Sequence, residues 1–335
     1  MPLRNTAAPP SRRGVVVIAG PTAVGKTQVA LALAQRLDAE IVCADSRTVY
    51  RGMDIGTAKP SLPDRAAVPH HLLDVADPGE PFTLADYQRL AVEAIAGIHD
   101  RGRTAILTGG TGLYIRAVVD RVTVPAAAPD WDLRERLAGE ERTGGPGTLH
   151  RRLREVDPAA AARIHPHNVR RVIRALEVWE VTGTPMSAFH AQVRGGRWTT
   201  NEGTGATGMA ALTMARERLR DRIDRRIDAQ VRGGLVEEVR SLLQAGYHQT
   251  LPSMQALGYR EIAAHLAGES TLDTALAQLR RDTYRYAKRQ LTWFRADPRY
   301  RWIDVSDEPA EEVASRVLEA LEPRKPGDDA AGSML

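Results

Sequence analysis

Eight consecutive residues near the N-terminus, GPTAVGKT at 20–27, match the pattern G-x-x-x-x-G-K-[ST] of a phosphate-binding loop. The glycines let the backbone curl round an anion so that its N–H groups face it, Lys26 adds a positive charge, and the Thr27 hydroxyl can hold Mg²⁺. A glycine-rich turn without function is the alternative, but the loop follows an apolar run and opens a helical pattern, which favours function. We expect a di- or triphosphate compound to bind here, with contacts from Gly20, Thr22, Ala23, Val24, Gly25, Lys26 and Thr27.

A carboxylate follows the second apolar run, at Asp45. Ligands of open parallel sheets bind at the carboxyl ends of the strands, so Asp45 is a candidate general base or metal-side acid. Its alternative role is to cap the turn that follows, and position alone does not decide between the two. A strand ending in an acid beside the metal, as nucleotide hydrolases have, is not obvious, because the run at 103–109 leads into GGTGLY at 109–114. The ligand of the loop therefore need not be a nucleotide.

Strand patterns alternate with helical ones along the chain, which predicts a P-loop NTPase-like α/β fold: a doubly wound parallel sheet with a mainly helical insertion domain. The strands are expected at 14–20, 40–45, 103–109, 210–214 and 300–305, and helices at 25–37, 83–98 and within 217–296. A Pro/Ala linker at 125–129 and a Gly/Thr stretch at 195–208 bound the insertion. We predict a catalytic core at 14–119 and 206–310, the insertion at 120–205, and flexible tails at 1–13 and 323–335.

The composition is that of a globular protein of 335 residues, with 43% hydrophobic and 26% charged side chains. No apolar run is long enough for a membrane span and the N-terminus has no signal-peptide pattern, so we expect a soluble, cytoplasmic protein. A single cysteine, Cys43, excludes an intrachain disulfide and a cysteine-based zinc cluster. Arginine is concentrated in the second half, as expected for a surface that binds a polyanion.

Seven segments in this order between about Val15 and Asp304 together resemble one family. They are GPTAVGKT (20–27), ADSRTVYRGMDIGTAKP (44–60), VPHHLLDVADP (68–78), LTGGTGLYIRAVV (107–119), RRVIRALEVWEVTGTP (170–185), LPSMQALGYRE (251–261) and AKRQLTWFR (287–295). The chain resembles the tRNA dimethylallyltransferases, also called tRNA isopentenyltransferases.

The resemblance implies transfer of a dimethylallyl group from dimethylallyl diphosphate to N6 of the adenosine 3′ of the anticodon, in tRNAs that read codons beginning with U. The partners would be dimethylallyl diphosphate and the tRNA anticodon stem-loop, the cofactor Mg²⁺, and the protein a monomer. The loop would hold the leaving diphosphate while Asp45 accepts the proton of the attacking amine.

Further site residues follow from the same resemblance. Thr111 and Arg134 match positions that contact tRNA near the reactive base, so the resemblance implies that they are catalytic residues together with Asp45. Arg216 matches an arginine that would clamp the diphosphate. The resemblance gives less support for a diphosphate contact by Arg222. The alternative for these arginines is the solvated face of a helix whose core stripe is Leu219, Ile223 and Ile227.

A folded tRNA must be gripped by its phosphates, and the target base must be extruded from the anticodon loop. Basic residues interleaved with aromatic ones fit that task, whereas ordinary charged helix faces are the alternative for each segment alone. The expected tRNA contacts are Asp45, Ser46, Arg47, Thr48, Arg170, Arg171, Arg174, Gln255, Gly258, Tyr259, Arg260, Lys288, Arg289, Gln290 and Arg295.

The chain departs from the family pattern at three places: Thr48 replaces a glutamine, Tyr284-Arg285 replaces Arg-Gln, and Arg121 replaces a common glycine. These changes bear on substrate preference more than on reaction type. Three other functions remain: a small-molecule kinase, a prenyltransferase of free adenine nucleotides, and a non-catalytic RNA-binding ATPase module. The first two need no large basic surface, and the third leaves Asp45 and the GGTGLY segment without a purpose.

Overall fold

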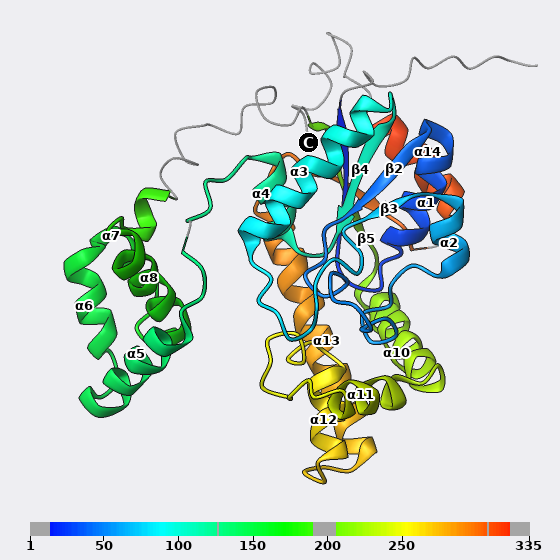
Figure 1. Cartoon of the computed structure of the whole chain (residues 1–335). Helices are drawn as coiled ribbons and strands as arrows, with labels where there is room; N and C mark the ends of the chain where they lie inside the picture. The colour runs from blue at the N-terminus through cyan, green and yellow to red at the C-terminus, as the bar shows by residue number, and fades with distance from the viewer. Residues whose placement is uncertain (1–13, 126, 190–205, 307, 322–335) are drawn as a thin grey trace, which may run out of the picture. The chain divides into compact units, whose positions relative to one another are not determined.

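The computed structural model describes residues 14–125, 127–189, 206–306 and 308–321 (Figure 1). The described residues of 1–80, 90–115 and 200–335 form unit 1, and those of 81–89 and 116–199 form unit 2. No helix in the described part of the chain is long and apolar enough to cross a membrane.

Unit 1 is built on one parallel six-stranded sheet with the strand order β3-β2-β4-β1-β5-β6. The strands are β1 (Val15–Ala19), β2 (Ala39–Cys43), β3 (His70–His71), β4 (Thr104–Gly109), β5 (Ala206–Thr213) and β6 (Arg301–Asp304). Every residue of β1, β2 and β4 is buried, which is why these strands read as continuous apolar runs rather than alternating ones. The predicted α/β fold is confirmed.

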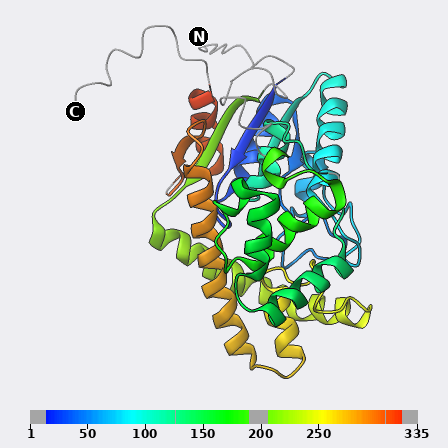
Figure 2. The same cartoon turned by 90° about the vertical axis from the view of Figure 1, so that its left-hand side faces the viewer.

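Helices cover both faces of the sheet: α1 and α14 lie on one side and α3 on the other (Figure 1). The helices that lie wholly or partly in unit 1 are α1 (Lys26–Leu37), α2 (Leu62–Ala67), α3 (Leu84–Asp100), α4 (Gly112–Val119), α10 (Arg216–Arg232), α11 (Leu235–Gln244), α12 (Tyr259–Leu266), α13 (Leu272–Arg295) and α14 (Ala310–Leu321). The sequence prediction ended the core at residue 310 and missed α14, which buries Val313, Ala314 and Val317. The long orange helix in Figure 2 is α13.

The inner strands end at the same level of the sheet. Ala19, the last residue of β1, pairs with Gly109 of β4, and Cys43 of β2 pairs with Thr108. The segments that follow β1, β2 and β4 therefore leave the sheet side by side. These segments carry the phosphate loop, Asp45 and Thr111 respectively.

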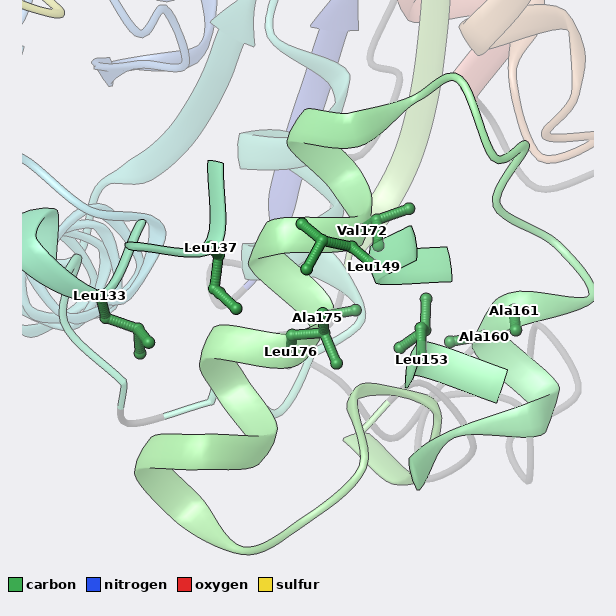
Figure 3. Packing of buried hydrophobic residues seen from close by; sticks show 9 residues of the cluster. All are labelled: Leu133, Leu137, Leu149, Leu153, Ala160, Ala161, Val172, Ala175 and Leu176. Carbon is green, nitrogen blue, oxygen red and sulfur yellow. The ribbon is translucent and has the colours of Figure 1, made fainter. Parts of the chain in front are cut away.

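Unit 2 contains α5 (Trp131–Gly144), α6 (Thr148–Val156), α7 (Pro158–Ala161) and α8 (Val169–Thr182). Its core is a cluster of aliphatic side chains shown in Figure 3: Leu133, Leu137, Leu149, Leu153, Ala160, Ala161, Val172, Ala175 and Leu176. The unit differs from the predicted insertion at 120–205 because it also takes in residues 81–89, at the start of α3. Gln88 explains this, since its amide donates to the carbonyls of Ala117 (2.6 Å) and Val122 (2.9 Å). Residues 190–205 and both predicted tails lie outside the described residues.

Candidate active site

The phosphate loop connects β1 to α1 as the motif predicts. Lys26 is the first residue of α1 and donates from Nζ to the carbonyl of Pro21 at 2.8 Å, which closes the loop on itself. The first turn of α1 contains no acidic residue. The positive end of the helix dipole is therefore not neutralised from within the helix, and the loop is suited to an anion.

Two arginines of α10 lie beside this loop. A Cβ atom placed on Gly25 would lie 3.3 Å from Nη2 of Arg222, so this guanidinium packs against the loop backbone. Arg226, one helical turn further on, donates to the carbonyl of Thr57 at 3.2 Å. Burial lowers the pKa values of both arginines, and the charge of Asp45 partly opposes this for Arg226.

Burial also lowers the pKa of Lys26, to about 8, with Asp45 opposing the shift and Arg226 adding to it. The side chains of Lys26, Arg226 and Asp45 are thus close enough to act on one another. The site concentrates positive charge on partly buried side chains, an arrangement that an anionic ligand would stabilise.

Asp45 lies at the carboxyl end of β2, two residues beyond Cys43. Its Oδ1 atom accepts a hydrogen bond from the backbone N–H of Arg47 at 2.9 Å, so the turn-capping role considered from the sequence is real. The negative charge of the same carboxylate acts to raise the pKa values of Lys26, Arg226 and Tyr286. The cap fixes the orientation of the carboxylate and does not compete with a function as a base.

Thr111 lies next to Asp45 because β4 and β2 are neighbours. Its N–H donates to the carbonyl of Ala44 at 3.1 Å, and its Oγ1 accepts from the N–H of Ser46 at 3.1 Å. A Cβ atom on Gly109 would lie 2.0 Å from the Ala44 oxygen, so only glycine permits this approach. The Gly-Gly-Thr sequence therefore holds the segment after β4 against the turn that carries Asp45.

Tyr286 of α13 completes this group. Burial raises the pKa of Tyr286 to about 12, with Asp45 adding to the shift, and a hydrogen bond with Thr111 acts in the opposite direction. The phenol is therefore neutral at physiological pH and stays available as a hydrogen-bond donor.

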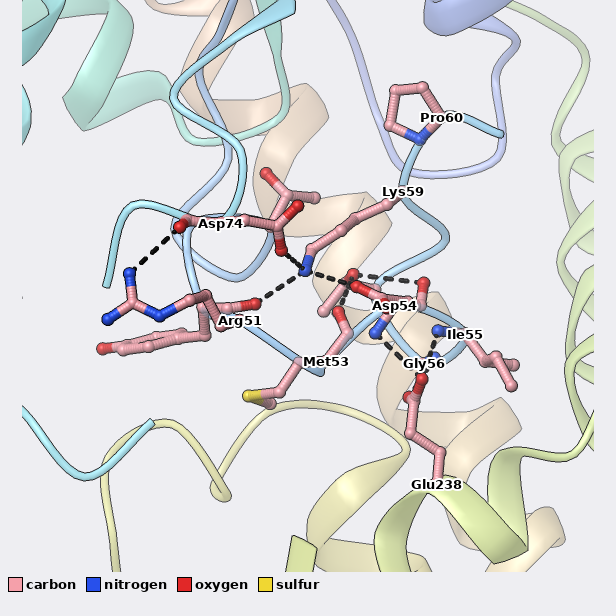
Figure 4. A network of polar contacts seen from close by, with 12 residues as sticks. Arg51, Met53, Asp54, Ile55, Gly56, Lys59, Pro60, Asp74 and Glu238 are labelled. Atoms are coloured by element: carbon pink, nitrogen blue, oxygen red, sulfur yellow. Dashed lines mark hydrogen bonds and ion pairs between the residues drawn. The ribbon is translucent and has the colours of Figure 1, made fainter. Parts of the chain in front are cut away.

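A polar network supports the cationic side of the site (Figure 4). Glu238 of α11 accepts hydrogen bonds from three successive backbone N–H groups, those of residues 54, 55 and 56, at 2.9, 2.7 and 3.0 Å. The ammonium of Lys59, whose side chain is 1% exposed, pairs with Asp54 at 2.5 Å and with Asp74. This network fixes the turn that contains Thr57, and the carbonyl of Thr57 accepts a hydrogen bond from the guanidinium of Arg226.

The structure brings together the loop, Asp45, Ser46 and Thr111 from the sequence prediction. Arg216 is exposed at the first residue of α10, and its role stays a prediction. Arg134 belongs to unit 2, where it forms a two-point ion pair with the fully buried Glu177 at 2.8 and 2.9 Å. Sequence reasoning did not select Arg226 or Tyr286, although Arg226 directly precedes a core residue, Ile227, and so lies at the edge of the buried face.

Four expected tRNA contacts are buried in the structure. Tyr259 is 0% exposed and donates to Glu238 at 2.6 Å, and Gly258 is the buried N-cap of α12. Thr48 is 7% exposed, with its hydroxyl directed at its own turn. Gln290 is 6% exposed and bridges two loops of the site. All four residues are engaged within the protein, and their contact with RNA stays a prediction.

The other expected tRNA contacts divide into exposed and engaged groups. Arg170, Arg171, Gln255, Lys288, Arg289 and Arg295 are exposed. Arg174 pairs with Glu177, Arg260 pairs with Glu261 and Asp282, and Arg47 donates to the Pro252 carbonyl. The exposed cations are the ones directly available for a polyanion.

A model of the IPP transferase family matches residues 48–297 of the chain. The chain belongs to this family. A tRNA dimethylallyltransferase of Syntrophobacter fumaroxidans is 51% identical over 293 residues, 88% of this chain and 84% of the relative. Another, of Desulforudis audaxviator, is 51% identical over 294 residues, 88% of this chain and 92% of the relative.

Solved structures of the IPP transferase family share the fold. The tRNA isopentenylpyrophosphate transferase of Bacillus halodurans superposes with a TM-score of 0.66 at 42% identity, covering 92% of this chain and 97% of that one. A eukaryotic dimethylallyltransferase acting on tRNA superposes with a TM-score of 0.76 at 25% identity, covering 94% and 81%.

The lowered pKa of Lys26 predicts a pH dependence of anion binding by this IPP transferase. Lys26 carries its charge below about pH 8 and loses it above, so affinity for inorganic pyrophosphate should fall as the pH rises through 8. Calorimetric titration between pH 7 and 9.5 measures this, with Lys26→Met as the control that removes the titrating group. The same pH dependence in wild type and Lys26→Met would show that Lys26 is not its source.

Proposed function

We propose that the protein transfers a dimethylallyl group from dimethylallyl diphosphate to N6 of the adenosine 3′-adjacent to the anticodon, in tRNAs that read codons beginning with U, and releases diphosphate. The observation that carries the proposal is that a phosphate loop after β1 and a fixed carboxylate after β2, Asp45, share one cationic site, at the ends of the two strands that flank β4. The names of the relatives at 51% identity support the same chemistry.

The donor half of the reaction would use the loop and its cations. The bond between the allylic carbon C1 and the diphosphate oxygen breaks, and its electron pair leaves with the diphosphate. Lys26, Arg222 and the N–H groups at the start of α1 would stabilise this charge. Because the cations are already fixed by the fold, no reorganisation is needed as the bond breaks.

The acceptor half would use the group at the ends of β2 and β4. The adenine N6 atom forms the new bond to C1 and loses a proton, which Asp45 accepts. An exocyclic amine of adenine is a poor nucleophile because its lone pair is delocalised into the ring, so a positioned carboxylate is needed. Thr111 and the neutral phenol of Tyr286 lie beside Asp45 and would orient the amine.

Mg²⁺ is the proposed cofactor. No three His, Cys, Asp or Glu side chains gather into a metal site in the described parts of the chain. That fits Mg²⁺, which usually keeps several waters and binds through few protein oxygens plus substrate phosphates. Thr27, in the first turn of α1, would supply the hydroxyl ligand. When bound, the ion would spread the negative charge of the leaving diphosphate.

Exposed cations in each unit would hold the tRNA. Arg170 and Arg171 lie on the exposed side of α8 in unit 2, whereas Lys288, Arg289 and Arg295 are exposed on α13 in unit 1. Phosphate contacts of this kind grip a folded RNA without reading its sequence. We further propose that the protein acts as a monomer in the cytoplasm, with the anticodon stem-loop as the bound part of the tRNA.

A transfer assay tests the proposed function. Purified protein is incubated with Mg²⁺, labelled dimethylallyl diphosphate and either unmodified tRNA or AMP, and the nucleosides are analysed by mass. We expect a dimethylallyl gain on adenosine from tRNA alone. A gain on AMP would indicate a prenyltransferase of free adenine nucleotides. Transfer to neither acceptor would favour the alternative function, a small-molecule kinase.

Replacing the proposed base predicts a loss of turnover. Asp45→Asn should lower kcat by about 10²- to 10⁴-fold, the usual contribution of a general base, while tRNA affinity changes little. Asp221→Asn, an exposed acid on α10, is the matched control. Single-turnover transfer rates and filter binding measure the two quantities. A kcat unchanged by Asp45→Asn would remove Asp45 from this role.

Removing one exposed cation from each unit predicts weaker tRNA binding with a smaller salt dependence. Arg170→Ala combined with Lys288→Ala should reduce the slope of log affinity against log salt by about two, because each lost phosphate contact removes about one unit. Arg142→Ala with Arg240→Ala makes the same charge change at arginines that pair with Glu135 and Glu237, and serves as control. If the slope of log affinity against log salt is the same in the test and control variants, Arg170 and Lys288 do not contact the tRNA phosphates.

A further inference from the structure

Gln290 of α13 lies between two loops of the site that come from distant parts of the chain. Its Oε1 atom accepts a hydrogen bond from the backbone N–H of Thr22 at 2.8 Å, and its Nε2 atom donates to the carbonyl of Gly110 at 2.9 Å. The residue is 6% exposed. Both ends of one buried amide are therefore used, one on each loop.

The side chain fits this place closely. A Cβ atom on Gly110 would lie 2.2 Å from Nε2 of Gln290, so the loop after β4 can approach α13 only because residue 110 has no side chain. Gly112 is similar, since its Cβ would lie 2.2 Å from the indole of Trp293. Helix α13 is thus in direct contact with the loop after β4 at Gln290 and with the start of α4 at Trp293.

The two loops joined by Gln290 have different tasks in the proposed reaction. Thr22 belongs to the loop that would hold the diphosphate of the donor. Gly110 directly precedes Thr111, whose Oγ1 accepts from the N–H of Ser46 beside Asp45. The bonded path from Thr22 through Gln290 and Gly110 to Thr111 therefore connects the donor side of the site to the acceptor side.

We propose that Gln290 is a positioning residue that sets the distance between the diphosphate loop and the Asp45–Thr111 group. This inference rests on the proposed function, because it concerns the alignment of that reaction. A displacement at carbon needs the nucleophile and the leaving group on opposite sides of the reacting atom, so the separation of the two loops controls whether bound substrates are aligned. Each loop would still bind its own substrate without Gln290.

The replacement Gln290→Met tests this separation of roles, because methionine has a similar length but can neither accept from Thr22 nor donate to Gly110. We expect kcat to fall by about 10²-fold, the cost of a misplacement near 1 Å, while the Kd of each substrate measured alone stays within about threefold. Gln278→Met, on the same helix but bonded to Asp282, is the matched control and should keep the wild-type kcat. The proposal would be overturned if Gln290→Met kept the wild-type kcat. It would also be overturned if the affinity for tRNA fell by the same factor as kcat.

A second variant gives a readout that simple loss of structure would not produce. In Gln290→Glu one carboxylate oxygen still accepts from Thr22, but the other faces the Gly110 carbonyl and repels it when ionised. Protonation restores a donor at that position, so the ratio of variant to wild-type kcat should rise as the pH is lowered from 8.5 to 6. A ratio that is flat across this range would count against the positioning role.

Wild-type transfer to tRNA is measured first in the same experiment. If wild type transfers no prenyl group, the proposed function fails, and the Gln290 inference fails with it. If wild type is active but Gln290→Met keeps its kcat, or Gln290→Glu shows no pH-dependent ratio, only the positioning role fails. Calorimetric melting of each variant confirms that the compared proteins are folded.

Discussion

Partly buried positive charge is the constraint on which the rest of the site depends. Lys26, Arg222 and Arg226 all have lowered pKa values, and burial is the largest cause for each. Removing a cation from water is costly unless an anion compensates it, and Asp45 is the carboxylate that opposes the shifts of Lys26 and Arg226. One carboxylate cannot balance three cations, so the site has a net need for negative charge. A diphosphate would meet that need, and its departure as a more highly charged leaving group would be favoured by the same field.

Holding these cations in place requires parts of the fold that touch no substrate. Arg226 is fixed by the carbonyl of Thr57, and the turn that carries Thr57 is fixed in turn by Glu238, which accepts from three successive amides. The buried phenol of Tyr259 then donates to Glu238. The turn at 54–57 and the helices α11 and α12 thus all contribute to the position of one guanidinium on α10. Rigid support of this kind is what allows charge to stay fixed while a bond breaks, since mobile dipoles would have to reorganise.

The sheet could be predicted because its inner strands are buried on both faces and therefore appear as apolar runs, whereas β3 could not, because two histidines at an edge carry no periodicity. The loop and Asp45 could be predicted from the sequence for a related reason, because their proposed function depends on local spacing after a strand. Tyr259 and Gln290 show where this reasoning ends. Both are polar residues in segments that look suited to RNA, yet each is buried by a partner that only the tertiary structure supplies, Glu238 for one and the Thr22 amide for the other. Arg226 was missed for the opposite reason, since a charged residue beside a core stripe is usually solvated.

The division between a charge-holding site and exposed cations separates two kinds of selectivity. The phosphate loop, which we propose binds a diphosphate, carries no information about the nucleophile, so a kinase and a prenyltransferase could share it. In the proposed reaction the nucleophile is selected near Asp45, where Thr111 accepts from the N–H of Ser46 and the neutral phenol of Tyr286 is within the electrostatic reach of the carboxylate. These groups can orient an amine beside its base, but they cannot distinguish a nucleoside within tRNA from a free one. That distinction must come from phosphate contacts remote from the reacting atoms, and exposed arginines on α8 and basic residues on α13 are where the structure makes such contacts available. In the proposed reaction, chemistry and acceptor choice therefore reside in different residues.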